Sequence, residues 1–214
     1  MYQHILFDLD GTLTDPFEGI TNSVVHALKR YNIEVTDKRE LRSFIGPPLV
    51  ESFMKYFNFT EADAKNAVEV YREHFGTKGL FENELYEGIP QMLETLKKRG
   101  KTVIMATSKP EVYARRIAEH FDIAKYFDYM AGSELNGQRI AKTEVIEYAL
   151  DALGITDRQN CIMVGDRLHD INGAKKSGIK SIGVLWGYGS EKEFLDAGAD
   201  YICPSVENLI DIIG

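Results

Sequence analysis

The stretch that decides the fold is ILFDLDGTLTD, residues 5–15. Apolar residues run to Phe7, and two aspartates, Asp8 and Asp10, follow with a single leucine between them. An apolar run without polar alternation is typical of a strand that is buried on both faces of a parallel sheet. Since open parallel sheets bind ligands at the carboxyl ends of their strands, this stretch predicts a strand that ends in a functional site.

Similar apolar runs recur along the chain, and amphipathic stretches with helix start and stop signals lie between them. Alternating strands and helices predict an α/β fold, a doubly wound parallel sheet with helices on both faces. The predicted strands are HILFDL (4–9), KTVIMAT (101–107), NCIMVGD (160–166), KSIGVLW (180–186) and ADYICP (199–204). The predicted helices lie within residues 88–101, 109–121, 142–154 and 169–179.

Residues 16–81 break this alternation, because they contain amphipathic stretches and no run typical of a strand. They predict a small all-helical domain inserted after the first strand, and the α/β core then comprises residues 1–15 and 82–214. Aromatic residues recur near helical spacing in this segment, which favours a hydrophobic core of its own. They are Phe53, Tyr56, Phe57, Phe59, Tyr71 and Phe75.

Composition excludes several classes of protein. The net charge of −8 argues against binding a nucleic-acid polymer, which needs clustered basic residues. No apolar stretch approaches the roughly 20 residues of a membrane helix, and no signal segment is visible. Cys161 and Cys203 lie beside apolar runs without metal-binding spacing, so we expect buried, reduced thiols and a cytoplasmic protein.

Carboxylates follow two of the predicted strands. Asp8 follows the first, and Asp166 and Asp170 follow the strand at 160–166. Clustered carboxylates repel one another, and a divalent cation relieves that repulsion. Because these are hard oxygen donors, they predict Mg²⁺ and not zinc.

Hydroxyl groups, a lysine and a tight turn point to a phosphate ligand at the same edge. Thr107 and Ser108 follow the strand at 101–107, and Lys142 begins a predicted helix. These side chains, together with backbone N–H groups near Gly11 and Thr12, are suited to holding phosphate oxygens. Asp8 is then placed as a nucleophile, and Asp10 can protonate the leaving oxygen and later activate water.

Simpler readings stay open for several residues. Asp8 and Asp10 can form an ordinary strand-end turn, and Asp170 can cap the helix that follows it. Lys109 and Arg167 stand beside these motifs as contacts to substrate or as surface residues.

The loop FIGPPL in the helical segment is open in the same way. Phe44, Gly46 and Pro47 either shape a turn into a helix or contact the leaving group.

Four motifs, DLDGTL, ATSKP, the lysine of AKTEV and GDRLHD, occur in the order found in the haloacid dehalogenase-like hydrolases. The chain resembles this family over nearly its whole length. It is most similar to the branch with a helical cap that includes phosphoglycolate phosphatases and 5′-nucleotidases. Pro16 in TDP, where many relatives have TDS, is a small departure.

The resemblance implies a Rossmann-like core, a phospho-aspartyl intermediate on Asp8 and acid–base catalysis by Asp10. It implies Mg²⁺ bound by the Asp8 carboxylate, the Asp10 backbone carbonyl and Asp166, with Asp170 binding directly or through water. Thr107 and Lys142 are then the phosphate ligands. We expect the cap to close over substrate on hinges near Asp15 and residues 81–85, because lid motions are absorbed at a few linker residues.

The function we expect is a Mg²⁺-dependent phosphatase of a small phosphorylated metabolite, phosphoglycolate or a nucleoside monophosphate. The alternatives are a phosphomutase on the same core, a dehalogenase, which needs neither metal nor the acid at Asp10, and a catalytically inactive binding protein. The sequence does not indicate the oligomeric state.

Overall fold

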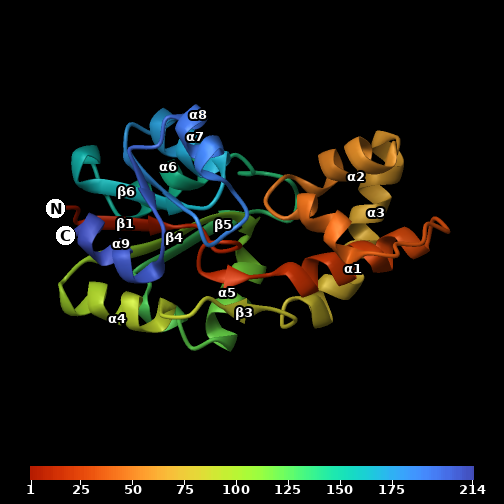
Figure 1. Cartoon of the computed structure of the whole chain (residues 1–214), viewed down its shortest axis with the longest axis horizontal. Helices are drawn as coiled ribbons and strands as arrows, with labels where there is room; N and C mark the ends of the chain where they lie inside the picture. Colours follow the sequence, from red (N-terminus) through yellow and green to blue (C-terminus); the bar gives the residue numbers. More distant parts are fainter. The chain divides into compact units, whose positions relative to one another are not determined.

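The computed structural model describes all 214 residues and divides into two compact units (Figure 1). The α/β unit comprises Met1–Asp15 and Leu85–Gly214, and the helical unit comprises Pro16–Glu84. From the sequence, the second boundary is expected at residue 81. Two short strands, β2 (Thr14–Asp15) and β3 (Glu84–Leu85), pair at the two boundaries, a feature that the sequence does not predict.

A six-stranded sheet with the order β5-β4-β1-β6-β7-β8 forms the centre of the α/β unit, and all neighbouring strands are parallel. This confirms the predicted doubly wound sheet. Its strands are β1 (His4–Phe7), β4 (Thr102–Pro110), β5 (Tyr129–Ser133), β6 (Cys161–Gly165), β7 (Lys180–Val184) and β8 (Tyr201–Cys203).

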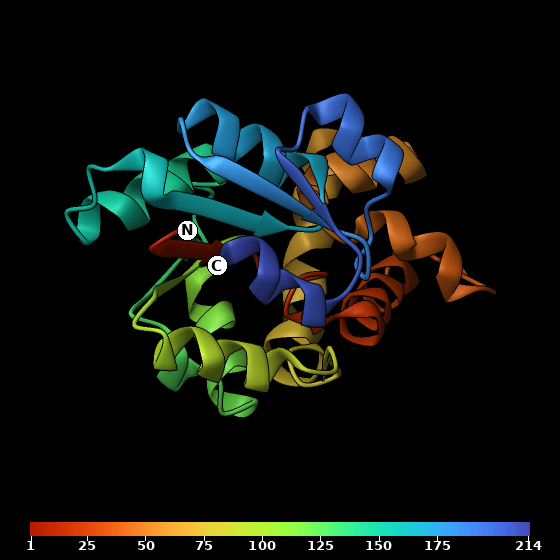
Figure 2. The same cartoon turned by 60° about the vertical axis from the view of Figure 1, so that its left-hand side comes forward.

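Helices cover both faces of the sheet, as Figures 1 and 2 show. One face carries α4 (Ile89–Lys98), α5 (Glu111–His120) and α9 (Val206–Ile213), and the other carries α6 (Lys142–Ala152), α7 (Leu168–Lys176) and α8 (Glu191–Ala197). On the second face Leu6, Ile104 and Met163 pack in one buried cluster with Val145 and Ala174. Burial on both faces explains why the central strands read as unbroken apolar runs.

The strand order places the end of β1 at a topological switch point. The chain builds β1, β4 and β5 outward in one direction and then returns to place β6 on the other side of β1. Phe7 at the end of β1 is in register with Met105 on β4 and Val164 on β6. Asp8 therefore leaves the sheet between two neighbouring strand ends, the usual position of a ligand in this architecture.

The helical unit consists of α1 (Phe17–Lys29), a 3₁₀ helix (Lys38–Phe44), α2 (Leu49–Phe57), α3 (Glu61–His74) and a π-helical turn (Phe75–Gly79). Most of the aromatic side chains predicted for its core are buried or half-buried. Tyr56 departs from that prediction, because it is 43% exposed at the end of α2. The side chain of Thr60 caps α3 by accepting from the N–H of Asp63 at 3.2 Å.

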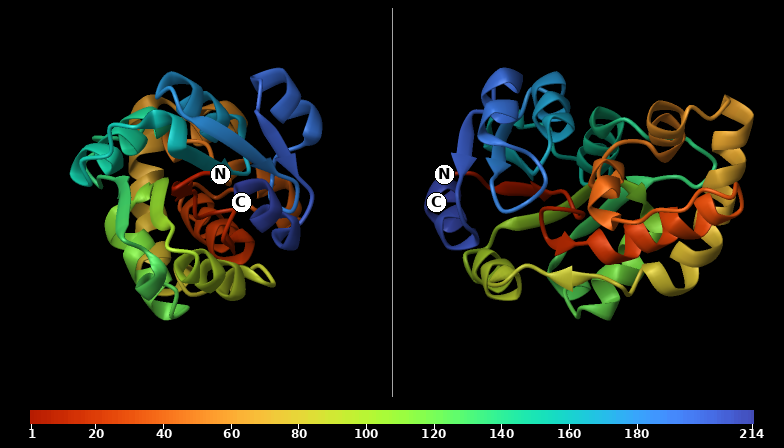
Figure 3. Two further views of the ribbon diagram at one scale, coloured as in Figure 1. Left: turned by 90° about the vertical axis from the view of Figure 1, so that its left-hand side faces the viewer. Right: turned by 45° about the vertical axis from the view of Figure 1, so that its right-hand side comes forward.

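The two chain ends lie together at the amino ends of the strands (Figure 3), where the N–H of Tyr2 donates to the carbonyl of Ile213 at 3.1 Å. Asp8, by contrast, follows the carboxyl end of β1. Among the helices, none combines the length and the apolar character that crossing a membrane requires.

Candidate active site

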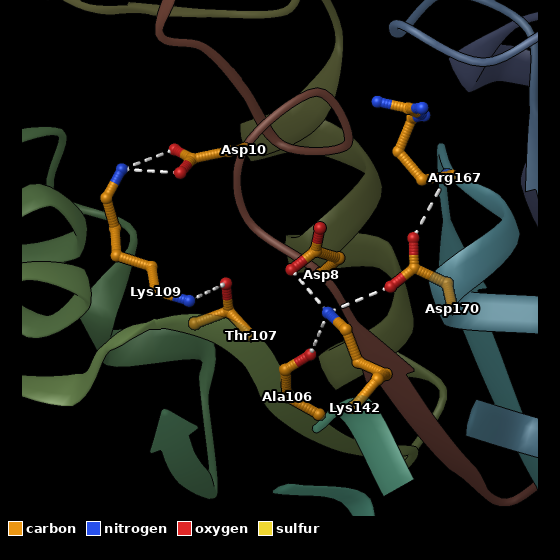
Figure 4. A network of polar contacts seen from close by, with 8 residues as sticks. All are labelled: Asp8, Asp10, Ala106, Thr107, Lys109, Lys142, Arg167 and Asp170. Carbon is orange, nitrogen blue, oxygen red and sulfur yellow. Dashed lines mark hydrogen bonds and ion pairs between the residues drawn. The ribbon is translucent and has the colours of Figure 1, made fainter. Parts of the chain in front are cut away.

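Lys142 links three parts of the site (Figure 4). It is the first residue of α6, and its side chain is 4% exposed. Its Nζ lies 2.7 Å from Asp8 Oδ1, 2.8 Å from Asp170 Oδ1 and 3.0 Å from the carbonyl oxygen of Ala106. Burial lowers the pKa of Lys142, but the two ion pairs outweigh it, so the pKa is raised and the ammonium stays charged. This lysine therefore joins the end of β1 and the middle of β4 to the first turn of α7.

Asp8, Asp166 and Asp170 form a buried acidic trio whose closest oxygen atoms all lie within 4.8 Å of one another. Burial raises the pKa of Asp166 well above its ordinary value, and the charges of Asp170 and Asp8 raise it further. Burial likewise raises the pKa of Asp170 to about 6, although Lys142 opposes the shift. When all three carboxyl groups are ionised, one lysine balances only part of their negative charge.

The donor set fits a hard divalent cation. Asp166 Oδ2 accepts from the N–H of Tyr188 at 2.8 Å, whereas Oδ1 is buried without a hydrogen-bond partner. Such an atom is costly unless something binds it. Three converging carboxylates with no nitrogen or sulfur donor among them suit Mg²⁺.

Glycines let the backbone approach these carboxylates closely. A Cβ at Gly11 would lie 2.1 Å from Asp166 Oδ2, and one at Gly165 would lie 2.2 Å from the carboxyl carbon of Asp170. Gly11 also has a φ of +83°, which side chains rarely adopt. The glycine of the first motif is thus required by the turn and by the neighbouring carboxylate.

Asp10 lies apart from the acidic trio. Both of its carboxylate oxygens contact Lys109 Nζ, at 2.7 and 2.5 Å, and Figure 4 shows this pair beside the one formed by Asp8 and Lys142. Burial raises the pKa of Asp10, and Lys109 partly offsets the shift. Lys109, which the sequence leaves open as a contact to substrate or a surface residue, is buried against Asp10.

The predicted phosphate ligands of the second motif lie at the end of β4. Thr107 is buried, and its hydroxyl oxygen accepts from the N–H of Lys109 at 3.2 Å. Ser108 is half-buried. Both residues lie on the strand next to β1, at the same edge of the sheet as Asp8.

The backbone donors expected from the first motif are engaged inside their own loop. The N–H of Gly11 donates to the carbonyl of Thr14 at 2.7 Å, and the N–H of Thr12 donates to that of Leu9 at 3.2 Å. A contact of either group with phosphate requires this loop to rearrange. Their role as phosphate donors therefore stays a prediction.

Arg167 is part of the scaffold at the start of α7. Its Nε lies 3.0 Å from Glu193 Oε1, which also accepts from the N–H of Leu168 at 2.7 Å. Its own N–H donates to Asp170 Oδ2 at 3.0 Å. Asp170 thus combines both roles open to it from the sequence, a helix-start acceptor and a member of the acidic trio.

The three candidates from FIGPPL lie in the helical unit. Phe44 is 2% exposed and packs 5.1 Å from the ring of Phe53, so it is a core residue and not a surface contact for a leaving group. Its large apolar ring explains that position. Gly46 is exposed with a φ of +103°, and Pro47 is half-buried before α2, as expected for a rigid turn.

One structural part of the site escapes motif reasoning, the loop after β7. Trp186 Nε1 donates to the carbonyl of Thr12 at 3.0 Å, and the hydroxyl of Tyr188 donates to Asp15. A Cβ at Gly187 would lie 2.2 Å from the carbonyl oxygen of Gly11. The sequence signal is the pair Gly187 and Gly189 just after the predicted strand at 180–186, because glycines beside a strand indicate a close backbone approach.

The chain is similar to known proteins over nearly its whole length. The model of the family described as haloacid dehalogenase-like hydrolase matches residues 5–184. A 5′-nucleotidase from Pseudomonas aeruginosa is 48% identical over 212 residues, which cover 99% of this chain and 96% of that protein. The crystal structure of a predicted phosphatase from Clostridium acetobutylicum matches with a TM-score of 0.95 and 48% identity, covering 100% of this chain and 98% of that one.

A relative with a different printed activity is the tyrosine-protein kinase PtkA of Mycobacterium tuberculosis. It is 38% identical over 194 residues, which cover 91% of this chain but 65% of the kinase. This chain therefore spans about two thirds of that protein's length.

Proposed function

Because this chain belongs to the haloacid dehalogenase-like hydrolase family, as its four motifs predict, we propose that it is a Mg²⁺-dependent phosphatase of small phosphate monoesters that forms a phospho-aspartyl intermediate on Asp8. Its reaction class, phosphoric monoester hydrolysis, follows from its phosphatase relatives. The observation that best supports a phospho-aspartyl mechanism is the buried Lys142. Its Nζ lies between Asp8 and Asp170 at the end of the central strand.

In the first step, a carboxylate oxygen of Asp8 attacks the phosphorus atom and the bond from phosphorus to the ester oxygen breaks. The leaving oxygen takes a proton from the carboxyl group of Asp10, which yields the free alcohol and the Asp10 carboxylate. Lys142 offsets the repulsion between the attacking carboxylate and the phosphate dianion, and Thr107 holds a phosphate oxygen.

In the second step, water attacks the phosphorus atom of the phospho-aspartate and passes a proton to the Asp10 carboxylate. The bond from phosphorus to the Asp8 oxygen breaks, and inorganic phosphate leaves. Asp8 is thereby restored as a carboxylate and Asp10 as an acid, so the cycle closes with no other reactant than water.

We propose that Mg²⁺ binds to Asp8, Asp166 and the backbone carbonyl of Asp10, with Asp170 in direct or water-mediated contact. When bound, the ion supplies positive charge that stabilises the phosphate oxygens during transfer. The support is the buried trio and the unpartnered Oδ1 of Asp166.

For the substrate, we favour a nucleoside monophosphate over phosphoglycolate. The support is the 5′-nucleotidase, which is 48% identical over 96% of its length. We further propose that residues 16–81 act as a cap that moves on hinges near Asp15 and residues 81–85, since lids move at a few linker positions. A cytoplasmic location is part of this proposal, and the buried free thiols of Cys161 and Cys203 fit it.

The test is phosphate release from nucleoside monophosphates, phosphoglycolate, sugar phosphates, pyrophosphate and p-nitrophenyl phosphate, each with Mg²⁺ and with EDTA. We expect release that needs Mg²⁺, is fastest with a nucleoside monophosphate, and is absent in Asp8→Asn. Phosphoryl transfer between sugar phosphates without net release would instead identify a phosphomutase. The absence of any reaction with every compound would favour the alternative that the chain is a catalytically inactive binding protein.

A further inference from the structure

We propose that Lys109 is a positioning residue for Asp10, which holds the carboxyl group where it exchanges protons with the leaving oxygen and then with water. The inference rests on the proposed function, because Asp10 has this role only in a phosphatase of that type. It gives Lys109 a specific task in the reaction, acting through Asp10 and not on the phosphate.

The ion pair has the geometry of a fixed contact. Lys109 Nζ lies 2.7 Å from one oxygen of Asp10 and 2.5 Å from the other. The two side chains are only 5% and 14% exposed. The contact to both oxygens belongs to the Asp10 carboxylate, the form that takes a proton from water. In the acid form one oxygen carries the proton, and Lys109 Nζ keeps its contact with the other.

The backbone of Lys109 is itself held in place. Its N–H donates to the hydroxyl oxygen of Thr107 at 3.2 Å, which ties it to a predicted phosphate ligand. Its carbonyl oxygen packs against β5, where a Cβ at Gly132 would lie 2.6 Å away. The ammonium group therefore extends to Asp10 from a backbone that contacts both Thr107 and β5, within an irregular part of the β4–β5 pairing.

Each proposed catalytic aspartate thus has its own lysine. Lys142, on α6, contacts Asp8 at 2.7 Å, and Lys109, on β4, contacts Asp10. Figure 4 shows the two pairs directed to different sides, although the aspartates are two positions apart in the sequence. The proposed nucleophile and the proposed acid therefore have separate cationic partners.

This arrangement has a kinetic consequence that depends on the leaving group. An alkoxide needs a proton as it departs, whereas p-nitrophenolate departs without one. The ratio kcat/KM reports the steps up to the first irreversible transfer to Asp8. Loss of the correct position of Asp10 therefore lowers kcat/KM for an alkyl ester more than for p-nitrophenyl phosphate.

The experiment compares kcat/KM for a nucleoside 5′-monophosphate and for p-nitrophenyl phosphate in K109M, K109R, D10N and the double variant D10N/K109M. In K109M we expect a fall of about 100-fold for the nucleotide and of no more than about threefold for p-nitrophenyl phosphate. K109R keeps a cation and is expected to recover part of the loss. In the D10N background, K109M is expected to cause no further change in the ratio of the kcat/KM values for the two substrates.

Lys101 supplies the matched control, because it is also a buried lysine and directly precedes β4, at the end away from the site. Its Nζ donates to the carbonyl of Tyr2 at 2.8 Å, and K101M is expected to leave the substrate ratio unchanged. If K109M itself does not fold, the comparison of D10N/K109M with D10N still tests the inference. The double variant removes both charges of the pair and so leaves no unpaired buried charge.

Equal losses on both substrates, or a further loss in the D10N background, would overturn the inference and indicate that Lys109 binds the phosphate itself. A wild-type protein that releases phosphate from neither ester would overturn the proposed function instead. The two failures are therefore distinguishable by the activity of the wild-type protein.

Discussion

The two units bury their polar side chains in different ways. In the helical unit, the buried polar residues are hydroxyl-bearing and donate to backbone carbonyls one turn earlier: Thr21 to Phe17 at 2.7 Å, Ser23 to Gly19 at 2.6 Å and Ser52 to Pro48 at 3.2 Å. In the α/β unit, all buried charged side chains except Lys101 lie together at one edge of the sheet. They are Asp8, Lys109, Lys142, Asp166 and Asp170, with Asp10 nearly buried beside them.

Burying a charge costs free energy even when it is paired, while a hydroxyl bonded inside a helix costs little. The α/β unit thus contains a cluster of buried charges that costs folding free energy at the proposed catalytic site. The helical unit contains no such cluster. Disturbing the cluster is expected to change activity more than stability, and disturbing the aromatic core of the helical unit is expected to do the reverse.

The largest expected effect is that of Asp8→Asn. Loss of the nucleophile is expected to reduce kcat by about 10⁴-fold or more, equivalent to about 5 kcal/mol of activation free energy. The fold is retained, because the amide has the same shape and Lys142 keeps its ion pair with Asp170 at 2.8 Å. Steady-state kinetics and urea unfolding measure the two quantities, with the exposed Asp151→Asn on α6 as the control. A turnover near that of the wild type would exclude Asp8 as the nucleophile.

Phe53→Ala tests the opposite side of the comparison. Phe53 is fully buried and packs against Phe44 and Phe59 at ring distances of 5.1 and 5.8 Å. Its truncation is expected to lower the free energy of unfolding of the helical unit by about 3–5 kcal/mol. Tyr56→Ala, at a site 43% exposed, is expected to cost clearly less in the same denaturant titration. Equal costs would show that the aromatic cluster does not stabilise this unit.

Much of this division could be predicted from the sequence, because strand ends and helix periods are local signals. The central strands and the acidic residues that follow them needed no tertiary information. Strand β5 was missed, since YMAGS is a short segment at the sheet edge with small residues and no β-branched one. The strands β2 and β3 were missed because two residues contain no periodicity.

The partners of the basic residues beside the motifs could not be predicted in the same way. Lys109 and Arg167 both stand beside a motif, yet one pairs with Asp10 and the other with Glu193. That choice depends on side-chain directions in three dimensions. Phe44 shows the same limit, because burial of its ring depends on how the 3₁₀ helix packs against α2.

Mg²⁺ is expected to stabilise the protein by an intermediate amount. An ion that binds only the folded state at 100 times its dissociation constant adds about 2.7 kcal/mol. The raised pKa values of Asp166 and Asp170 indicate how unfavourable the trio is without a counter-charge. Thermal unfolding with and without Mg²⁺ measures the effect, and Asp166→Asn is expected to abolish most of it. An undiminished Mg²⁺ shift in that variant would place the metal elsewhere.

The smallest expected effect concerns the cap of α3. Thr60→Ala removes the side-chain acceptor of the Asp63 N–H and is expected to cost about 1 kcal/mol of unfolding free energy. Thr60→Ser keeps the hydroxyl and is expected to cost much less. Phosphatase activity at low temperature is expected to stay unchanged in both. A large activity loss in Thr60→Ala alone would mean that the helical unit affects the chemistry through more than its stability.

The position of β1 at the centre of the sheet has a consequence for biosynthesis. This strand is synthesised well before its neighbours β4 and β6, which begin at Thr102 and Cys161. A nascent chain therefore carries an apolar strand with two unpaired edges until β4 and β6 have been synthesised, the kind of segment that aggregates or recruits chaperones. The helical unit is one continuous segment, Pro16–Glu84, and its helices can form before β4 and β6 have been synthesised.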